Sequence, residues 1–143
     1  MSYLNFAEEK KLWKQGFDVV VGLDEVGRGP LAGPVVAAAV FLQKNCRINI
    51  AVNDSKKLSE KRREELYEVL VNHPDVTWSI GMASEKVIDK INILQATKLA
   101  MQKALDNLDL KMQNADFNID YLLIDGNFGL QTEIAQKSII KGD

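Results

Sequence analysis

The feature that most constrains the fold is a pair of short apolar segments separated by glycine and proline. Phe17 to Asp24 is nearly unbroken in Val and Leu, which is typical of a strand covered on both faces. Val35 to Leu42 is a second such segment, and the intervening Gly and Pro residues predict a turn that joins the two strands as a hairpin. Strands of this kind need helices to cover them, so the sequence predicts an α/β protein.

Further strands and helices alternate along the chain. Val76 to Met82 alternates like a strand with one buried face, and short strands are predicted at Tyr121 to Ile124 and at Lys137 to Lys141. Four amphipathic helices are predicted, from Asn5 to Gln15, from the N-cap Ser59 to Pro74, from the N-cap Ser84, and from the N-cap Asn92 through Leu108. Asp109 to Asn118 is interpreted as a polar linker. This order predicts a mixed sheet flanked by helices, in one domain over residues 1–143.

Composition excludes several chemistries. The chain has 143 residues, of which 46% are hydrophobic, enough for a core without disulfides or a structural metal. Cys46 and His73 are the only residues of their types, which excludes an internal disulfide and a His/Cys zinc site and leaves His73 as the one candidate base of a His-dependent hydrolase. His73 precedes Pro74 and is interpreted as part of a helix terminus. Neither a signal peptide nor a membrane span is recognisable, so we expect a cytoplasmic protein without membrane association.

Charge is segregated along the sequence. Between Lys44 and Arg63 there are seven basic residues against two acidic ones, whereas the whole chain has a formal charge of −2. Such a segment is either the solvated face of a helix or a surface that faces phosphates beside an acidic site. The charge pattern alone leaves both interpretations open.

Three predicted strands end in carboxylates, which are Asp24 with Glu25, then Asp125, and then Asp143. Sites in open α/β sheets lie beyond the carboxyl ends of the strands, so these four residues are candidates for one cluster. Oxygen ligands suit Mg²⁺ or Mn²⁺, and a carboxylate cluster that holds two such ions is typical of phosphodiester hydrolysis. The alternative is that each carboxylate is a solvated turn residue, since Asp-Gly is a common turn pair.

Gly27, Arg28 and Gly29 directly follow the first two carboxylates. Two glycines around a basic residue let backbone N–H groups approach a nucleic-acid backbone or sugar closely, although the same residues also suit a simple hairpin turn. The segment matches neither a Walker loop nor a dinucleotide-binding fingerprint.

Five segments of the chain closely resemble the ribonuclease HII family of type 2 ribonucleases H. They are Gly22 to Pro34, Asp54 to Ser59, Asn92 to Thr97, Leu123 to Asn127 and Lys141 to Asp143. The resemblance implies a ribonuclease H-like fold and a monomeric endonuclease dependent on Mg²⁺ or Mn²⁺. It implies hydrolysis of the RNA strand of RNA·DNA hybrids and cutting at ribonucleotides embedded in duplex DNA, as in ribonucleotide excision repair. The products would carry 3′-hydroxyl and 5′-phosphate ends.

The resemblance also implies residue roles. The metal ligands of the family correspond to Asp24, Glu25, Asp125 and Asp143. Its motif that contacts the ribonucleotide 2′-hydroxyl and the following phosphate corresponds to Gly27, Arg28 and Gly29, and reading the 2′-hydroxyl distinguishes RNA from DNA. Lys56 and Lys57 are expected to face the phosphate backbone.

The chain departs from the family at its end. Family members continue past the residue that matches Asp143, with a helix that packs on the sheet and a tyrosine at the ribonucleotide junction. No tyrosine of this chain matches that position. We therefore expect a C-terminally truncated ribonuclease HII with weak or no activity alone, which only binds hybrid, associates through its bare sheet face or is completed by another chain. Type HIII enzymes are the alternative family, but they usually carry an additional N-terminal domain and lack the arginine motif.

Overall fold

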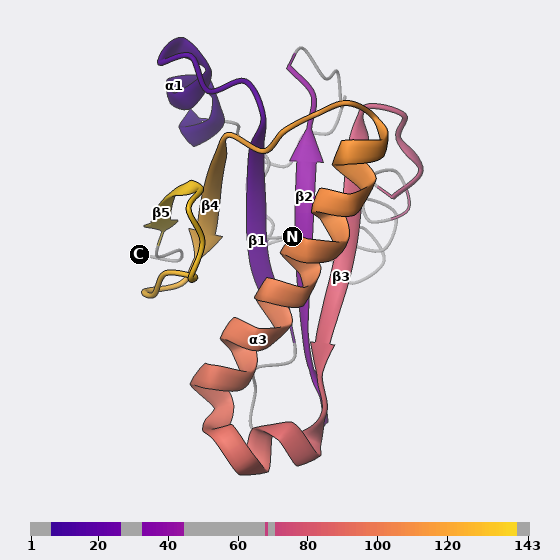
Figure 1. Ribbon diagram of the computed structural model, residues 1–143, viewed down its shortest axis with the longest axis vertical. Helices are drawn as coiled ribbons and strands as arrows, with labels where there is room; N and C mark the ends of the chain where they lie inside the picture. The colour runs from indigo at the N-terminus through magenta and orange to yellow at the C-terminus, as the bar shows by residue number, and fades with distance from the viewer. Residues whose placement is uncertain (1–6, 27–32, 45–67, 69–70, 140–143) are drawn as a thin grey trace.

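The computed structural model describes residues 7–26, 33–44, 68 and 71–139. Five strands form one mixed sheet in the order β3-β2-β1-β4-β5 (Figure 1). They are β1 (Val20–Val26), β2 (Val35–Leu42), β3 (Val76–Ala83), β4 (Tyr121–Asp125) and β5 (Ala135–Ile139). β2 is antiparallel to β1 and to β3, whereas β1 and β5 each run parallel to β4. The predicted α/β class, mixed sheet and β1–β2 hairpin are confirmed.

Two helices cover opposite faces of this sheet. The helix α3 (Glu85–Asn114) crosses one face (Figure 1) and packs on alternate residues of the strands, such as Leu23 and Ile124. The short helix α1 (Ala7–Lys14) packs on the other face, where its Leu12 meets Val20 and Leu123 in a smaller cluster. Because successive side chains of a strand point to opposite faces, alternate residues of each strand belong to one cluster or to the other.

The helix α3 is broken near its start, as the two predicted N-caps require. The Ser84 hydroxyl accepts a hydrogen bond from the Val87 N–H at 3.3 Å. Asn92 has φ 68° inside the helix, and its side-chain oxygen accepts from the Gln95 N–H at 3.0 Å. Asn is one of the few residues with a side chain that adopts positive φ readily, and it is also a preferred N-cap. The sequence prediction of a short helix followed by a longer one is confirmed.

Several predicted boundaries differ from the structure. The polar linker predicted at Asp109 to Asn118 is wrong over its first half, because α3 continues to Asn114 and buries Leu108 and Met112 beneath its polar face. β1 begins at Val20 rather than at Phe17 and extends through both of its carboxylates to Val26. β5 is Ala135–Ile139, so it begins before the predicted start at Lys137. Only part of the helix predicted from Ser59 lies in the described residues, and its last helical residues precede Pro74.

The backbones of α3 and β3 approach each other unusually closely. A Cβ placed on Gly81 would lie 2.3 Å from the carbonyl oxygen of Ala100 and 2.4 Å from the nitrogen of Ala104. The Ser79 hydroxyl donates to the carbonyl of Ala104 at 2.5 Å. Small residues on both elements therefore fix the position of the helix over the strand, because any larger side chain would hold the two backbones apart.

Candidate functional site

Two of the predicted carboxylates lie side by side at the carboxyl ends of neighbouring parallel strands. β1 and β4 are in register with Leu23 opposite Ile124, so the following residues, Asp24 and Asp125, are also neighbours. Leu23 and Ile124 face α3, and the residues that follow them point to the opposite face. Asp24 and Asp125 therefore both lie on the face that α1 covers in part. The two carboxylates thus lie close together at the strand ends, as the sequence predicts for this pair.

The carboxyl group of Asp125 acts on that of Asp24. The pKa of Asp24 is raised from 3.8 to about 7, first by burial and then by the charge of Asp125 and a side-chain hydrogen bond with it. Because two carboxylates offer only acceptors, that hydrogen bond needs Asp24 in its protonated form. Like charges in a partly desolvated site produce this behaviour in carboxylate pairs. A site of this kind favours a bound cation, which would relieve the repulsion.

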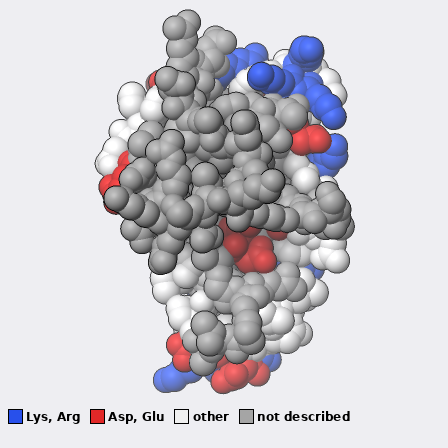
Figure 2. Space-filling view, turned by 180° about the vertical axis from the view of Figure 1, so that it is seen from behind, with Lys and Arg blue, Asp and Glu red and all other residues white. Residues whose placement is uncertain are grey.

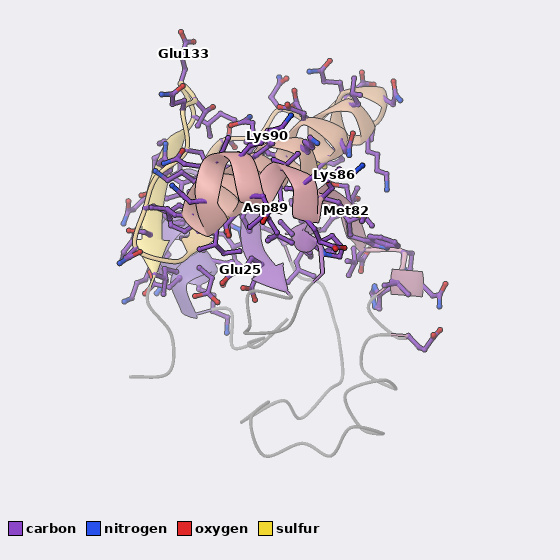
Figure 3. The ribbon with its side chains drawn as sticks, turned by 90° about the horizontal axis from the view of Figure 1, so that it is seen from below. Glu25, Met82, Lys86, Asp89, Lys90 and Glu133 are labelled. Carbon is purple, nitrogen blue, oxygen red and sulfur yellow. The ribbon has the colours of Figure 1, made fainter. Side chains whose placement is uncertain are left out.

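Glu25 stands apart from the pair although it is the next residue after Asp24. Successive strand residues point to opposite faces, so Glu25 is on the α3 side of β1. Its charge still raises the pKa of Asp24, as the weakest of the contributions that raise it. Figure 3 looks at this end of the sheet and shows Glu25 at the end of β1, with Lys86, Asp89 and Lys90 on the first turns of α3.

The remaining predicted site residues lie outside the described part of the chain. They are Gly27, Arg28, Gly29, Lys56, Lys57 and Asp143. Within the described ranges, no group of three or more Asp, Glu, His or Cys residues that could hold a metal ion is brought together. Acidic side chains are nevertheless exposed near the middle of the face opposite α3 (Figure 2). Of the four carboxylates predicted to form one cluster, the described residues bring together Asp24 and Asp125.

The donors present fit a hard cation better than a transition metal. Asp24 and Asp125 offer only carboxylate oxygens, which are the ligands that Mg²⁺ and Mn²⁺ prefer. The single histidine takes part in a local turn, where His73 Nδ1 accepts from the Asp75 N–H at 3.0 Å and its carbonyl accepts from the Val76 N–H. The interpretation of His73 as part of a helix terminus agrees with these contacts.

Sequence reasoning missed the residues that hold the site strands in place. The Asp120 carboxylate accepts hydrogen bonds from the backbone N–H groups of Asp18 and Val19, at 3.1 and 2.9 Å, and so ties the start of β1 to the start of β4. The partners are about a hundred residues apart in sequence, so no local pattern signals the contact. The only hint is an acidic residue placed directly before a predicted strand.

The loop after Asp125 is also anchored at a distance. Gln136 donates to the carbonyl of Leu130 and accepts from its N–H, both at 2.8 Å, and the Gly126 N–H donates to the carbonyl of Ile139 at 2.9 Å. This loop and α3 line a groove of about 430 Å³ that includes Lys98 and Leu99. The groove lies on the α3 side of the sheet, so it is separate from the carboxylate pair.

Solved structures with a similar fold are ribonucleases H. Bst-RNase HIII in complex with Mn²⁺ matches with a TM-score of 0.64 and 21% identity, over 79% of this chain and 38% of that one. The ribonuclease H2 from Pyrococcus horikoshii OT3 matches with a TM-score of 0.57 and 21% identity, over 86% of this chain and 63% of that one. The mixed sheet with carboxylates at its strand ends is therefore the ribonuclease H type of fold.

Sequence comparison narrows the class further. The family model of ribonuclease HII matches residues 21–141. Ribonuclease HII of Chlamydia caviae is 50% identical over 135 residues, which are 94% of this chain. The chain belongs to the ribonuclease HII family, and it spans 59% of the length of that relative. None of the helices in the described ranges combines the length and apolar character needed to cross a membrane.

Proposed function

We propose that this chain carries the catalytic centre of an endonuclease that hydrolyses the RNA strand of RNA·DNA hybrids and cuts at ribonucleotides embedded in duplex DNA. The observation that carries the proposal is the pairing of Asp24 with Asp125 at the ends of β1 and β4, where burial and the neighbouring charge raise the pKa of Asp24. Membership of the ribonuclease HII family, with 50% identity to a ribonuclease HII, supports the same substrate class.

In this proposal Asp24 and Asp125 hold Mg²⁺ or Mn²⁺ together with Asp143 and Glu25. Glu25 starts from the other face of β1, but its charge already acts on Asp24. Two such ions on one carboxylate cluster supply charge stabilisation and a water of lowered pKa, the usual apparatus for phosphodiester hydrolysis that leaves 3′-hydroxyl and 5′-phosphate ends. The protein holds Asp24 and Asp125 in place through the β1–β4 register and excludes part of the water from Asp24 by burial. Deprotonation of Asp24, favoured above about pH 7, prepares the pair to bind cations.

Recognition of the substrate is assigned to residues that flank this pair in sequence. Gly27, Arg28 and Gly29 follow β1 directly and would contact the ribonucleotide 2′-hydroxyl and the adjacent phosphate, as a protein must to distinguish RNA from DNA. Lys56 and Lys57, from the segment with the local excess of basic residues, would neutralise phosphates further along the duplex. This substrate preference would give the protein a role in ribonucleotide excision repair.

A gel assay on a duplex with one embedded ribonucleotide tests the proposal. The full 143-residue chain is incubated with Mn²⁺, with Mg²⁺ or with EDTA, beside Asp24→Asn, Asp125→Asn and the control Asp106→Asn. Asp106 is an exposed residue of α3. The proposal predicts metal-dependent cleavage 5′ to the ribonucleotide by the parent and the control, even if it is weak as the truncation leads us to expect, and none by the other two variants. Cleavage in EDTA, or undiminished cleavage by Asp24→Asn, would contradict the proposal.

A second candidate is a fragment that binds hybrid nucleic acid without cutting it. The observation in its favour is that the chain spans 59% of the length of its Chlamydia caviae relative. It predicts binding without turnover by the folded chain, with log affinity falling steeply against log salt. Recovery of cleavage on adding the segment that the relative has beyond its match to this chain would identify a fragment completed by a further segment.

A further inference from the structure

The strand β3 forms one edge of the described sheet, and half of its backbone faces away from β2. β2 and β3 pair with Ala39 opposite Ser79 and with Ala37 opposite Gly81. The carbonyl groups that α3 contacts belong to the alternate residues Trp78, Ile80 and Met82. In an antiparallel pair the N–H and C=O groups of a residue point to the same side, so these three residues turn both groups outward.

Three side chains of α3 cover this edge in a regular series, which we call the edge ladder. Lys103 donates to the carbonyl of Met82 at 3.1 Å, Asn107 to that of Ile80 at 2.9 Å, and Lys111 to that of Trp78 at 2.5 Å. The ammonium of Lys111 also lies 5.0 Å from the centre of the Trp78 ring. Every second carbonyl of the strand from Trp78 to Met82 thus receives a donor from the helix.

The ladder is possible because the helix and the strand have matching repeats. Four residues advance about 6 Å along a helix, and two residues advance about 6.6 Å along a strand. The donors are spaced by four residues and the acceptors by two, in opposite chain directions. The close approach of Gly81 to the backbone of Ala100 and Ala104 brings the helix near enough for these side chains to reach.

An open β3 edge would be well suited to pair with another strand. The side chains of Ile80 and Met82 are 45% and 47% exposed and lie on the same face of β3. An exposed apolar edge with unpaired backbone groups is a template for strand addition. Two copies of β3 related by a twofold axis would pair antiparallel and bring their Ile80 and Met82 side chains together.

We propose that the edge ladder closes the β3 edge against strand addition, and that the partner it excludes is a second copy of this chain. Lys103, Asn107 and Lys111 occupy the outward carbonyls, and their two ammonium groups place positive charge where an incoming strand would lie. Lysine at a sheet edge is a common means of opposing such pairing. Among the described residues, the edge ladder occupies the place at this edge where a further strand would pair.

The test compares the triple variant Lys103→Met, Asn107→Ala, Lys111→Met with a matched control, Lys86→Met, Lys90→Met, Asn114→Ala. The control removes the same groups from exposed positions of α3 (Figure 3 labels Lys86 and Lys90). Light scattering over a concentration series should show the mass of the triple variant doubling, with the parent and the control monomeric. Hydrogen exchange of the outward amides of β3 should slow in the dimer by at least about tenfold relative to the dilute variant.

Other outcomes overturn the proposal. A folded triple variant that stays monomeric at every concentration, or a dimer whose outward β3 amides still exchange as in the parent, would show that the ladder does not close the edge. Dimerisation of the control to the same extent would attribute the effect to lost charge alone. If the triple variant does not fold, Asn107→Ala removes only the middle donor and must itself show concentration-dependent association. Lys103→Arg with Lys111→Arg keeps both donors and must remain monomeric.

Discussion

Replacing Asp24 by asparagine is expected to stabilise the protein above neutral pH when divalent cations are absent. Burial and the neighbouring Asp125 raise the pKa of Asp24 from 3.8 to about 7. The side chain therefore carries an unfavourable charge in the folded protein above that pH. Asparagine has nearly the same shape, is neutral at every pH, and can donate to Asp125 as the protonated carboxyl does.

The sign and size of the expected change in the free energy of unfolding follow from proton binding by Asp24. Between pH 3.8 and about 7 the folded protein holds a proton on Asp24 that the unfolded chain has released, so the free energy of unfolding falls as pH rises through this interval. At 1.36 kcal/mol per pKa unit, the loss reaches about 4 kcal/mol by pH 8. The asparagine variant escapes this loss. Its midpoint of thermal unfolding should therefore exceed that of the parent by roughly 10 °C at pH 8 and by little near pH 4.

Thermal unfolding followed by circular dichroism, in EDTA and from pH 4.5 to 8.5, measures this effect. Asp106→Asn serves as the control, because it neutralises an exposed carboxylate of α3 and should keep the pH dependence of the parent. Added Mn²⁺ should raise the unfolding temperature of the parent more than that of Asp24→Asn, since it relieves the same repulsion. A parent whose stability does not change over this pH range, or an Asp24→Asn variant less stable than the parent at pH 8, would refute the reasoning.

Five further substitutions at four positions test how the fold positions the site, each by chemical denaturation. Gly81→Ala places a Cβ 2.3 Å from the α3 backbone and should cost at least about 2 kcal/mol. Gly129→Ala meets no backbone, only the Gln136 side chain at 3.1 Å, and should cost less than about 1 kcal/mol. Asn92→Gly, at φ 68°, should be nearly neutral, but Asn92→Val loses both the cap and the permitted backbone and should cost at least about 2 kcal/mol. Gln136→Leu removes both hydrogen bonds to Leu130 and should cost about 2 kcal/mol. Equal stability of the two glycine variants, equal stability of the two Asn92 variants, or a Gln136→Leu variant as stable as the parent would contradict these assignments.

The sequence predicted the local structure correctly where that structure depends on residues that are neighbours along the chain. Ser84 and Asn92 cap their helices as predicted, because capping involves residues only three positions apart. The end of α3 was missed, since its last turns present mostly polar residues and only Met112 and Leu108 are buried beneath them. The start of β1 was missed because Asp120 holds Asp18 and Val19 from a distant part of the chain.

The sequence by itself determined the α/β class, the hairpin and the family, because these follow from hydrophobic periodicity, turn residues and motifs that lie along the chain. It also singled out Asp24, Glu25 and Asp125 as residues at strand ends. Only the tertiary structure decided that Asp24 lies beside Asp125, on the face opposite that of Glu25. Register and burial set both that contact and the raised pKa of Asp24, and they exist only once β1 and β4 have paired. For the same reason the edge ladder of α3 on β3 has no signature in the sequence, since it joins residues that meet only when the helix packs on the sheet.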